Sequence, residues 1–130
     1  MTVGPVEYGD VTGDGSEEAI IVLYAELGGT ESAEDVFIYT LRNRMPVLLW
    51  KFATGDRAEG GLRRIYADNG ELVVELAGKD KIIGRDLYAD DGTSSGLCCP
   101  TLFTRTRYQW SNGRFRQRGE AEILPFTGWQ

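Results

Sequence analysis

Two Asn-Gly pairs constrain the fold of this chain more than any other feature, because each predicts a tight β-hairpin with a defined register. Asn-Gly favours the two-residue type I′ turn, whose twist matches that of antiparallel strands. A turn at Asn69-Gly70 brings four apolar side chains to one face, which belongs in a core: Ile65, Ala67, Leu72 and Val74. On the other face Arg64 lies opposite Glu75, and we expect these two to form an ion pair.

A second pair, Asn112-Gly113, predicts a hairpin near the C-terminus. Its register pairs Trp110 with Phe115 and Tyr108 with Gln117. Other strand signals recur along the chain, separated by Gly-containing or charged loops, at residues 3–8, 18–26, 35–42 and 47–53. The run at 18–26 is apolar for most of its length, as is typical of a central strand buried on both faces.

The last hairpin carries an arginine stripe on its second face: Arg105, Arg107, Arg114, Arg116 and Arg118. The register places Arg107 opposite Arg118 and Arg105 opposite Glu120. Acid groups of neighbouring strands, or an anionic ligand, would relieve the like-charge pair. A solvated outer face, with Glu122 also nearby, is the simpler interpretation.

No segment shows sustained helical periodicity, although the stretches 32–35 and 81–88 are each compatible with one short helix. We therefore expect a single domain, residues 1–130, that is mainly β. Its strands form an antiparallel meander of about seven, curled into a sandwich or a partly open barrel. The predicted core contains eight side chains: Ile21, Leu23, Phe37, Tyr39, Leu48, Ile65, Val74 and Trp110.

Residues 10–18 read D-V-T-G-D-G-S-E-E and lead directly into an apolar run. Oxygen-bearing side chains occupy loop positions one, three, five and nine, and Gly occupies position six. This spacing predicts a calcium site, because alternate residues point inward and Gly permits the sharp turn. The predicted ligands are Asp10, Thr12, Asp14, the Ser16 carbonyl and Glu18. A metal-free turn, in which Asp10 and Asp14 accept backbone N–H groups, accounts for the same residues.

The loop resembles the Asp-rich loop of FG-GAP/VCBS repeats, D-x-[D/N]-x-D-G-x-x-D followed by an apolar strand. Asp10, Asp14 and the Ser16 carbonyl match that pattern. Thr12 stands where Asp or Asn is usual, and Glu18 replaces the closing Asp. The loop occurs only once, so a propeller of several such blades is not expected.

Four segments together are similar to the LppP/LprE-type bacterial lipoprotein family: residues 9–22, Gly28-Gly29, Cys98-Cys99-Pro100 and the Y-x-W-x-x-G-x-F pattern at 108–115. The resemblance implies an extracytoplasmic bacterial protein, lipid-anchored or secreted, without assigned chemistry. The lipid-bearing Cys of such a protein would lie upstream of residue 1.

Cys98 and Cys99 end a long segment, residues 78–100, which is predicted to be a loop. The pair is compatible with two thiols, a strained bridge between neighbours or a link to another chain. Two small buried hydrophobes are the simplest interpretation. We expect this loop to pack beside the 108–115 hairpin, with any ligand site where they meet and the cysteines at its floor or edge.

Composition removes several classes of function. The chain has no histidine, which excludes Ser-His-Asp and Cys-His nucleophile pairs and His-ligated zinc. Its net charge of −6 argues against nucleic acid as a partner. No apolar run reaches the length of a transmembrane helix, and residues 1–20 lack the apolar region of a signal peptide.

These features favour a non-enzymatic extracytoplasmic domain that binds a protein or a carbohydrate and is stabilised by calcium. The alternative is a carboxylate-dependent polysaccharide hydrolase, which the acidic balance and the aromatic residues support. A pocket with two carboxylates at hydrolase spacing would favour the alternative. A flat surface without perturbed acids would favour the binding domain.

Overall fold

The computed structural model describes residues 2–28, 31–56, 61–84 and 100–127. This part of the chain contains β-strands and no helix, which confirms the predicted all-β class. The strands are β1 (Thr2–Gly9), β2 (Glu18–Gly28), β3 (Glu31–Arg42), β4 (Met45–Asp56), β5 (Leu62–Asp68), β6 (Glu71–Ala77), β7 (Leu102–Ser111), β8 (Arg114–Gln117) and β9 (Glu122–Pro125).

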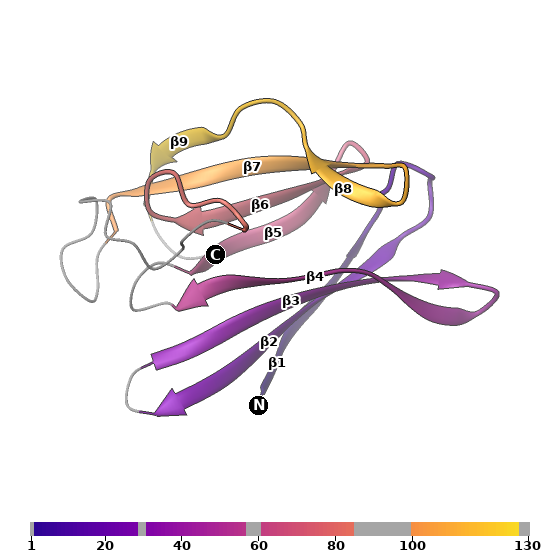
Figure 1. Ribbon diagram of the computed structural model, residues 1–130, viewed down its shortest axis with the longest axis horizontal. Helices are drawn as coiled ribbons and strands as arrows, with labels where there is room; N and C mark the ends of the chain where they lie inside the picture. The colour runs from indigo at the N-terminus through magenta and orange to yellow at the C-terminus, as the bar shows by residue number, and fades with distance from the viewer. Residues whose placement is uncertain (1, 29–30, 57–60, 85–99, 128–130) are drawn as a thin grey trace.

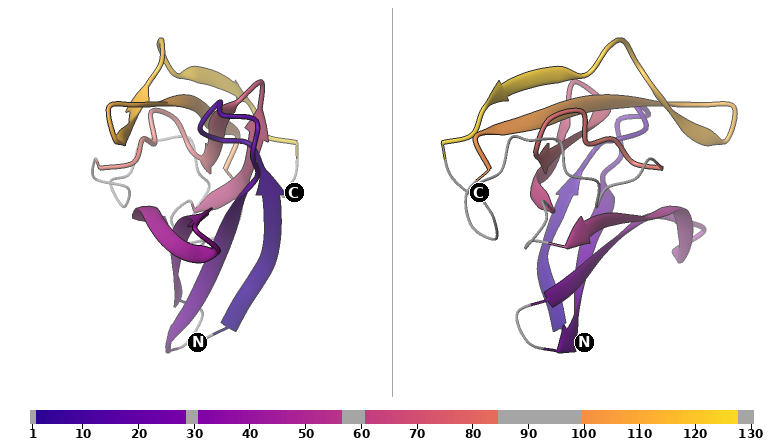
Figure 2. Two further views of the ribbon diagram at one scale, coloured as in Figure 1. Left: turned by 90° about the vertical axis from the view of Figure 1, so that its right-hand side faces the viewer. Right: turned by 60° about the vertical axis from the view of Figure 1, so that its left-hand side comes forward.

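The strands form two antiparallel sheets, and each follows chain order. The first sheet has the order β1-β2-β3-β4, and the second has the order β5-β6-β7-β8, with β9 also paired to β7. β8 pairs with the end of β7 and β9 with its beginning, so both lie along one side of β7. The sheets form two layers (Figure 1), and β1 and β2 run steeply across the direction of β7 (Figure 2).

The hydrophobic core lies between the two layers. The first sheet and its β1–β2 loop contribute Val11, Ile20, Val22, Val36, Ile38 and Phe52. The second sheet contributes Leu62, Ile65, Leu72, Val74, Leu76 and Tyr108. The two sheets do not close into a barrel, so of the two predicted arrangements, a sandwich or a partly open barrel, the described strands form the sandwich.

Both Asn-Gly hairpins have the predicted register. The φ angles of Asn69 and Gly70 are 52° and 74°, and those of Asn112 and Gly113 are 53° and 79°, as a type I′ turn requires. From Arg64 and Glu75 to the turn in the first hairpin, and throughout the β7–β8 pair, the strands pair residue by residue as the two-residue turns dictate.

The core prediction was right for Ile65 and Val74 of the second sheet, and wrong for Trp110 of β7 and for the first sheet. Ile65 and Val74 are buried. Leu48 is 46% exposed, and five other predicted core residues are only half-buried: Ile21, Leu23, Phe37, Tyr39 and Trp110. The core instead takes the alternate residues of β2 and β3, among them Ile20 and Ile38, because the first sheet is apolar on both faces and the pattern does not distinguish them.

Two short helices compatible with the sequence are not formed in the described residues. Residues 32–35 lie inside β3, and residues 81–84 have no helical structure, while residues 85–88 of the second stretch lie outside the described part. The strand pairing of β3 with β2 and β4 satisfies its backbone groups, which outweighs any local helical tendency. Cys98 and Cys99 lie outside the described residues.

The predicted ion pair between Arg64 and Glu75 is also wrong, although the two are register partners. A β-bulge between Leu62 and Arg64 changes the local register, and Glu75 pairs with Arg63 and Arg105 instead. The Arg64 guanidinium lies 4.1 Å from the centre of the Tyr66 ring. Bulges redirect side chains in this way, and sequence patterns do not reveal them.

Acid groups of neighbouring strands do relieve the arginine stripe. Glu71 of β6 accepts hydrogen bonds from both Arg107 and Arg118, and Asp68 accepts another from Arg107. These bonds, with that from Arg118 foremost, lower the pKa of Glu71. The expected solvated face is therefore confirmed for Arg114, Arg116 and Arg118, which are exposed, whereas Arg105 and Arg107 are half-buried.

The first residue of the stripe has a different partner from the one expected. Arg105 is the register partner of Glu122 in β9, not of Glu120. The reason is that β7 loses β8 as its neighbour after Gln117, and β9 takes over that side of the strand.

Candidate metal centre

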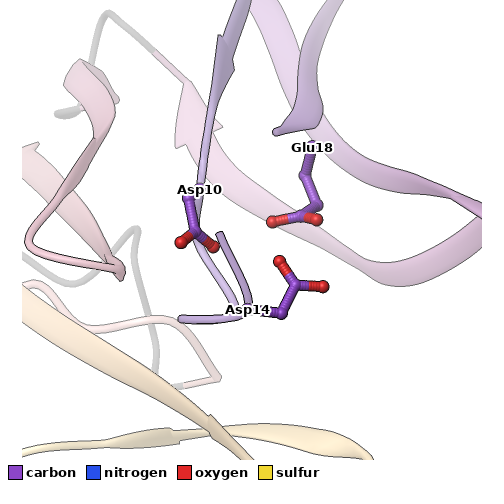
Figure 3. Close-up of side chains that lie close together, drawn as sticks. All are labelled: Asp10, Asp14 and Glu18. Atoms are coloured by element: carbon purple, nitrogen blue, oxygen red, sulfur yellow. The ribbon is translucent and has the colours of Figure 1, made fainter. Parts of the chain in front are cut away.

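The loop that joins β1 to β2 gathers the three predicted carboxylates. Asp10, Asp14 and Glu18 each offer an oxygen, and these oxygens all lie within 4.8 Å of one another. The three side chains converge on one space (Figure 3). Gly13 and Gly15 have φ angles of 81° and 86°, a conformation that only glycine adopts without strain, and this lets the loop curl around its own acidic residues.

Asp10 organises the backbone of the loop. Its Oδ1 accepts hydrogen bonds from the N–H groups of Thr12, at 3.2 Å, and Gly13, at 2.8 Å. Its Oδ2 accepts one from the N–H of Gly15 at 2.9 Å. Burial acts to raise the pKa of Asp10, but the backbone bonds outweigh it, so the pKa lies below its ordinary value. Asp10 is therefore ionised at neutral pH.

Glu18, the first residue of β2, is the buried member of the group, with 1% of its surface exposed. Its Oε1 accepts a hydrogen bond from the Val11 N–H at 3.0 Å, and its Oε2 accepts one from the Thr40 hydroxyl at 3.2 Å. Burial raises the pKa of Glu18, and the negative charges of Asp14 and Asp10 raise it further. A cation between the carboxylates would offset this repulsion.

Asp14 is the exposed member of the group. Its Oδ1 accepts a hydrogen bond from the Ser16 N–H at 2.8 Å. Its other oxygen, Oδ2, has no hydrogen bond in the described part of the chain. One carboxylate is thus fixed by the loop backbone, one is buried, and one remains open to solvent and to a ligand.

The other two predicted ligands have different positions. The Thr12 hydroxyl lies between two carboxylates, 3.5 Å from Asp10 Oδ1 and 3.4 Å from Glu18 Oε1. Ser16 is exposed and donates its backbone N–H to Asp14. The structure thus brings Asp10, Thr12, Asp14 and Glu18 together, whereas for Ser16 it establishes only the backbone bond within the loop.

The loop is supported by the β5–β6 turn of the second sheet. A Cβ on Gly70 would lie 3.1 Å from Gly13 Cα and 3.9 Å from Asp10 Oδ2. At the base of the loop, a Cβ on Gly9 would lie 2.5 Å from Ala67 Cβ. The candidate centre therefore lies at the junction of the two sheets, and the packing of glycine against glycine holds it there.

A shallow pocket of about 160 Å³ adjoins the loop. Its lining comes from the loop, the β3–β4 hairpin and β7: Thr12, Asp14, Thr40, Leu41, Arg42, Leu49 and Trp110. Asp14 belongs both to the carboxylate group and to this lining. Arg42 forms no ion pair within the described residues, so the pocket offers a guanidinium, a carboxylate, hydroxyls and an indole ring.

Sequence reasoning missed the residues that distant strands bring to this place. Thr40, Arg42 and Trp110 are 22 or more positions from Glu18 in the chain. The one sequence feature that could indicate the pocket is Trp110, an apolar residue beside a tight turn, which the sequence pattern places in the core instead. The ligand site expected beside the 78–100 loop stays a prediction, since residues 85–99 lie outside the described part.

Comparisons with known protein families, with characterised proteins and with solved structures found no match. The resemblances to FG-GAP/VCBS loops and to LppP/LprE-type lipoproteins therefore stay predictions. In the described residues no helix is long and apolar enough to cross a membrane.

Proposed function

We propose that this chain is a non-catalytic extracytoplasmic binding domain whose β1–β2 loop holds a calcium ion. One observation carries the proposal: three carboxylates from a nine-residue stretch lie within 4.8 Å of one another, and one of them is buried. Three negative charges so close together repel strongly unless a proton or a cation reduces the charge.

The donor set suits calcium better than other biological metals. All the candidate ligands are oxygens, which hard cations such as calcium prefer, and the chain has no histidine to bind zinc. Glycine at two positions gives the loop the flexibility that calcium tolerates and the strict octahedral geometry of magnesium does not. When bound, the ion would supply positive charge that holds Asp10, Asp14 and Glu18 in place.

The proposed site suits an environment rich in calcium. The backbone bonds of Asp10 and the raised pKa of Glu18 both compete with a metal, so we expect weak binding, at roughly 10⁻⁴–10⁻³ M, the range of extracellular modules. Such an affinity would suit the extracytoplasmic location implied by the lipoprotein resemblance, where calcium is abundant. A lipid anchor would require a segment before residue 1.

Calorimetric titration of calcium into the chain tests this function. We expect one binding event in the wild type and its loss in Asp14→Asn, which removes an exposed ligand with little effect on packing. Glu17→Gln is the matched control, because Glu17 is an exposed carboxylate of the same loop and is not part of the group. Equal calcium binding by the wild type and Asp14→Asn would contradict the proposed site.

The pocket beside the loop is the proposed place of ligand binding. An indole face with nearby hydroxyl and carboxylate groups suits a carbohydrate, which presents both apolar C–H faces and hydroxyl groups. Tryptophan fluorescence of the wild type and of Trp110→Phe, titrated with neutral and acidic saccharides, tests this. We expect a saturable change that requires Trp110, and no change with any saccharide would remove carbohydrate as the ligand class.

The hydrolase alternative has one supporting observation and two opposing ones. Asp10 and Glu18 have pKa values shifted in opposite directions, as acid and base pairs often do. However, Glu18 is buried, with both oxygens already hydrogen-bonded. Asp14 is the one carboxylate among the described residues that line the pocket, whereas glycoside hydrolysis needs two.

A further inference from the structure

The outer face of the first sheet is apolar and has no second layer over it in the described structure. Val3, Tyr8 and Leu48 on this face are 60%, 68% and 46% exposed. Around them lie further apolar side chains on the same face: Val6, Ile21, Leu23, Phe37 and Tyr39. Contiguous exposed apolar patches of this kind mark interaction sites.

The strand register places these side chains together. Val3 is the partner of Leu23, Ile21 is the partner of Phe37, and Tyr39 is the partner of Leu48. Register partners in an antiparallel sheet project from the same face. Their chain neighbours, such as Ile20 and Ile38, project from the opposite face and fill the core. The exposed side chains are therefore not needed for the core of this domain.

The second sheet is built differently on the side that faces away from the core, where charged side chains pair with one another and Glu71 and Glu75 are buried. Its outward side carries Glu71, Glu75, Arg105 and Arg107 in hydrogen-bonded ion pairs. The described side chains on the outer face of the first sheet include two charges, Asp35 and Lys51. One sandwich thus has one polar outer side and one apolar outer side.

The charge of this face suits a second copy of the same chain. The whole chain has a net charge of −6, which would make two copies repel each other, but the described side chains of this face include one positive and one negative group, Lys51 and Asp35. The partner of Asp35 is Ala53 and that of Lys51 is Phe37, so the two charges are diagonal neighbours on β3 and β4. A two-fold axis between them would place Asp35 of each copy opposite Lys51 of the other.

The size of the face also suits a dimer. Strands of 8, 11, 12 and 12 residues cover roughly 700 Å² of sheet, at about 3.3 Å per residue and about 4.8 Å between strands. A standard stable interface takes about 800 Å² from each partner. Sheets commonly pack face to face through interdigitating apolar side chains.

We propose that the outer face of the first sheet is the contact surface of a symmetric homodimer. In this arrangement the first sheets of two copies pack against each other, and the second sheets form the outside. The candidate metal centres lie at the junction of the two sheets and take no part in the contact.

Sedimentation equilibrium of the chain from about 1 to 500 µM tests the dimer. We expect the wild type to pass from monomer to dimer in this range. Leu48→Glu and Tyr8→Glu, at exposed positions that the core does not use, should each raise the dissociation constant at least tenfold. Ile123→Glu is the matched control, because Ile123 is an exposed apolar residue of β9 in the other sheet and should leave the dimer unchanged.

Charge exchange tests the proposed symmetry. Lys51→Asp alone should weaken the dimer at least tenfold, because each Asp35 would then face another acid. Lys51→Asp combined with Asp35→Lys should restore it. A wild type that stays monomeric at 500 µM would overturn the proposal. So would a monomer that binds neutral phospholipid vesicles through Tyr8 and Leu48, since the face would then serve a membrane surface.

Discussion

Two carboxylates of the same loop show how local geometry controls acidity at the scale of single residues. Asp10 and Glu18 are eight positions apart and share a common space, yet their pKa values move in opposite directions. Asp10 accepts three backbone N–H bonds, which favour its charged form. Burial dominates at Glu18 and favours the neutral form. Glu18 is therefore the residue through which pH acts on the candidate centre.

The substitution Glu18→Gln should separate calcium binding from folding. Glutamine keeps the shape and the oxygen that accepts the Val11 N–H, and it removes a charge that its neighbours repel. We expect urea unfolding without calcium to change by less than about 1 kcal/mol, and the stabilisation by calcium to disappear. In the wild type, calcium affinity should fall as the pH drops through the raised pKa of Glu18, because the metal competes with a proton. Undiminished calcium stabilisation in Glu18→Gln would contradict its role as a ligand.

Glu71 should make a contribution to the free energy of unfolding that depends on pH, because its pKa is lowered in the folded state. Its folded pKa lies below the ordinary value of 4.5, so its contribution is present above that value and is lost as the pH falls through the lowered pKa. Glu71→Gln should cost about 1.5–3 kcal/mol at pH 7, the range for hydrogen bonds to charged groups. The cost should shrink in acid, where the wild type also becomes neutral. Urea unfolding from pH 3 to pH 7 measures this, and Glu122→Gln, at a more exposed carboxylate, is the control.

The ligand prediction succeeded for carboxylates and missed the surrounding residues for a physical reason. Asp10, Asp14 and Glu18 lie in one short stretch, so the turn geometry of that stretch alone brings them together. Thr40 and Trp110 reach the site only through the packing of β3 and β7, which local pattern does not encode. Identifying these two residues requires the packing of the strands in three dimensions.

Turn chemistry determined which strand predictions succeeded at the scale of elements. The Asn69-Gly70 turn permits one register, so the core face of β5 and β6 followed from the sequence. β2 and β3 are apolar on both faces and are joined by residues that include no such turn, so the phase of their alternation stayed open. Because both faces of these strands are apolar, the core prediction chose the wrong set of residues. For the same reason, the face that lies outside the core, which is the face proposed for dimerisation, is apolar.

Gly70 and Gly113 occupy the same position in their two turns but have different surroundings, so they form a matched pair for substitution. Gly70 and Gly113 have similar positive φ angles, so an alanine at either should cost about 1–2 kcal/mol through backbone strain. A Cβ on Gly113 would meet nothing within 4 Å, whereas one on Gly70 would lie 3.1 Å from Gly13 Cα in the β1–β2 loop. We expect Gly70→Ala to cost about 1 kcal/mol more than Gly113→Ala in urea unfolding, because its added methyl group crowds Gly13.

Only Gly70→Ala should also weaken calcium binding, because only this turn touches the loop. Calorimetric titration of the two variants measures the difference. Equal calcium affinities in the two would mean that the β5–β6 turn does not hold the candidate centre in place.

At the scale of the whole molecule, the β1–β2 loop belongs to the first sheet and packs against the second, so it links the two layers of the sandwich through contacts. Val11 of the loop is fully buried in the core, and Glu18 begins the strand that follows. Gly9 and Gly13 pack against β5 and the β5–β6 turn of the other sheet. A calcium ion in this loop would therefore stabilise the junction of the sheets and, through it, the whole fold.

Thermal unfolding in 5 mM calcium and in a chelator tests this central claim most directly. A ligand that binds only the folded state raises its stability by RT ln(1 + [L]/Kd), which is about 1–2 kcal/mol for the affinity proposed here. For a domain of this length that corresponds to a rise of about 3–8 °C in Tm. We expect this rise with calcium, a smaller one with 5 mM magnesium, and none in Asp14→Asn. Identical Tm values in calcium and in chelator would contradict the account.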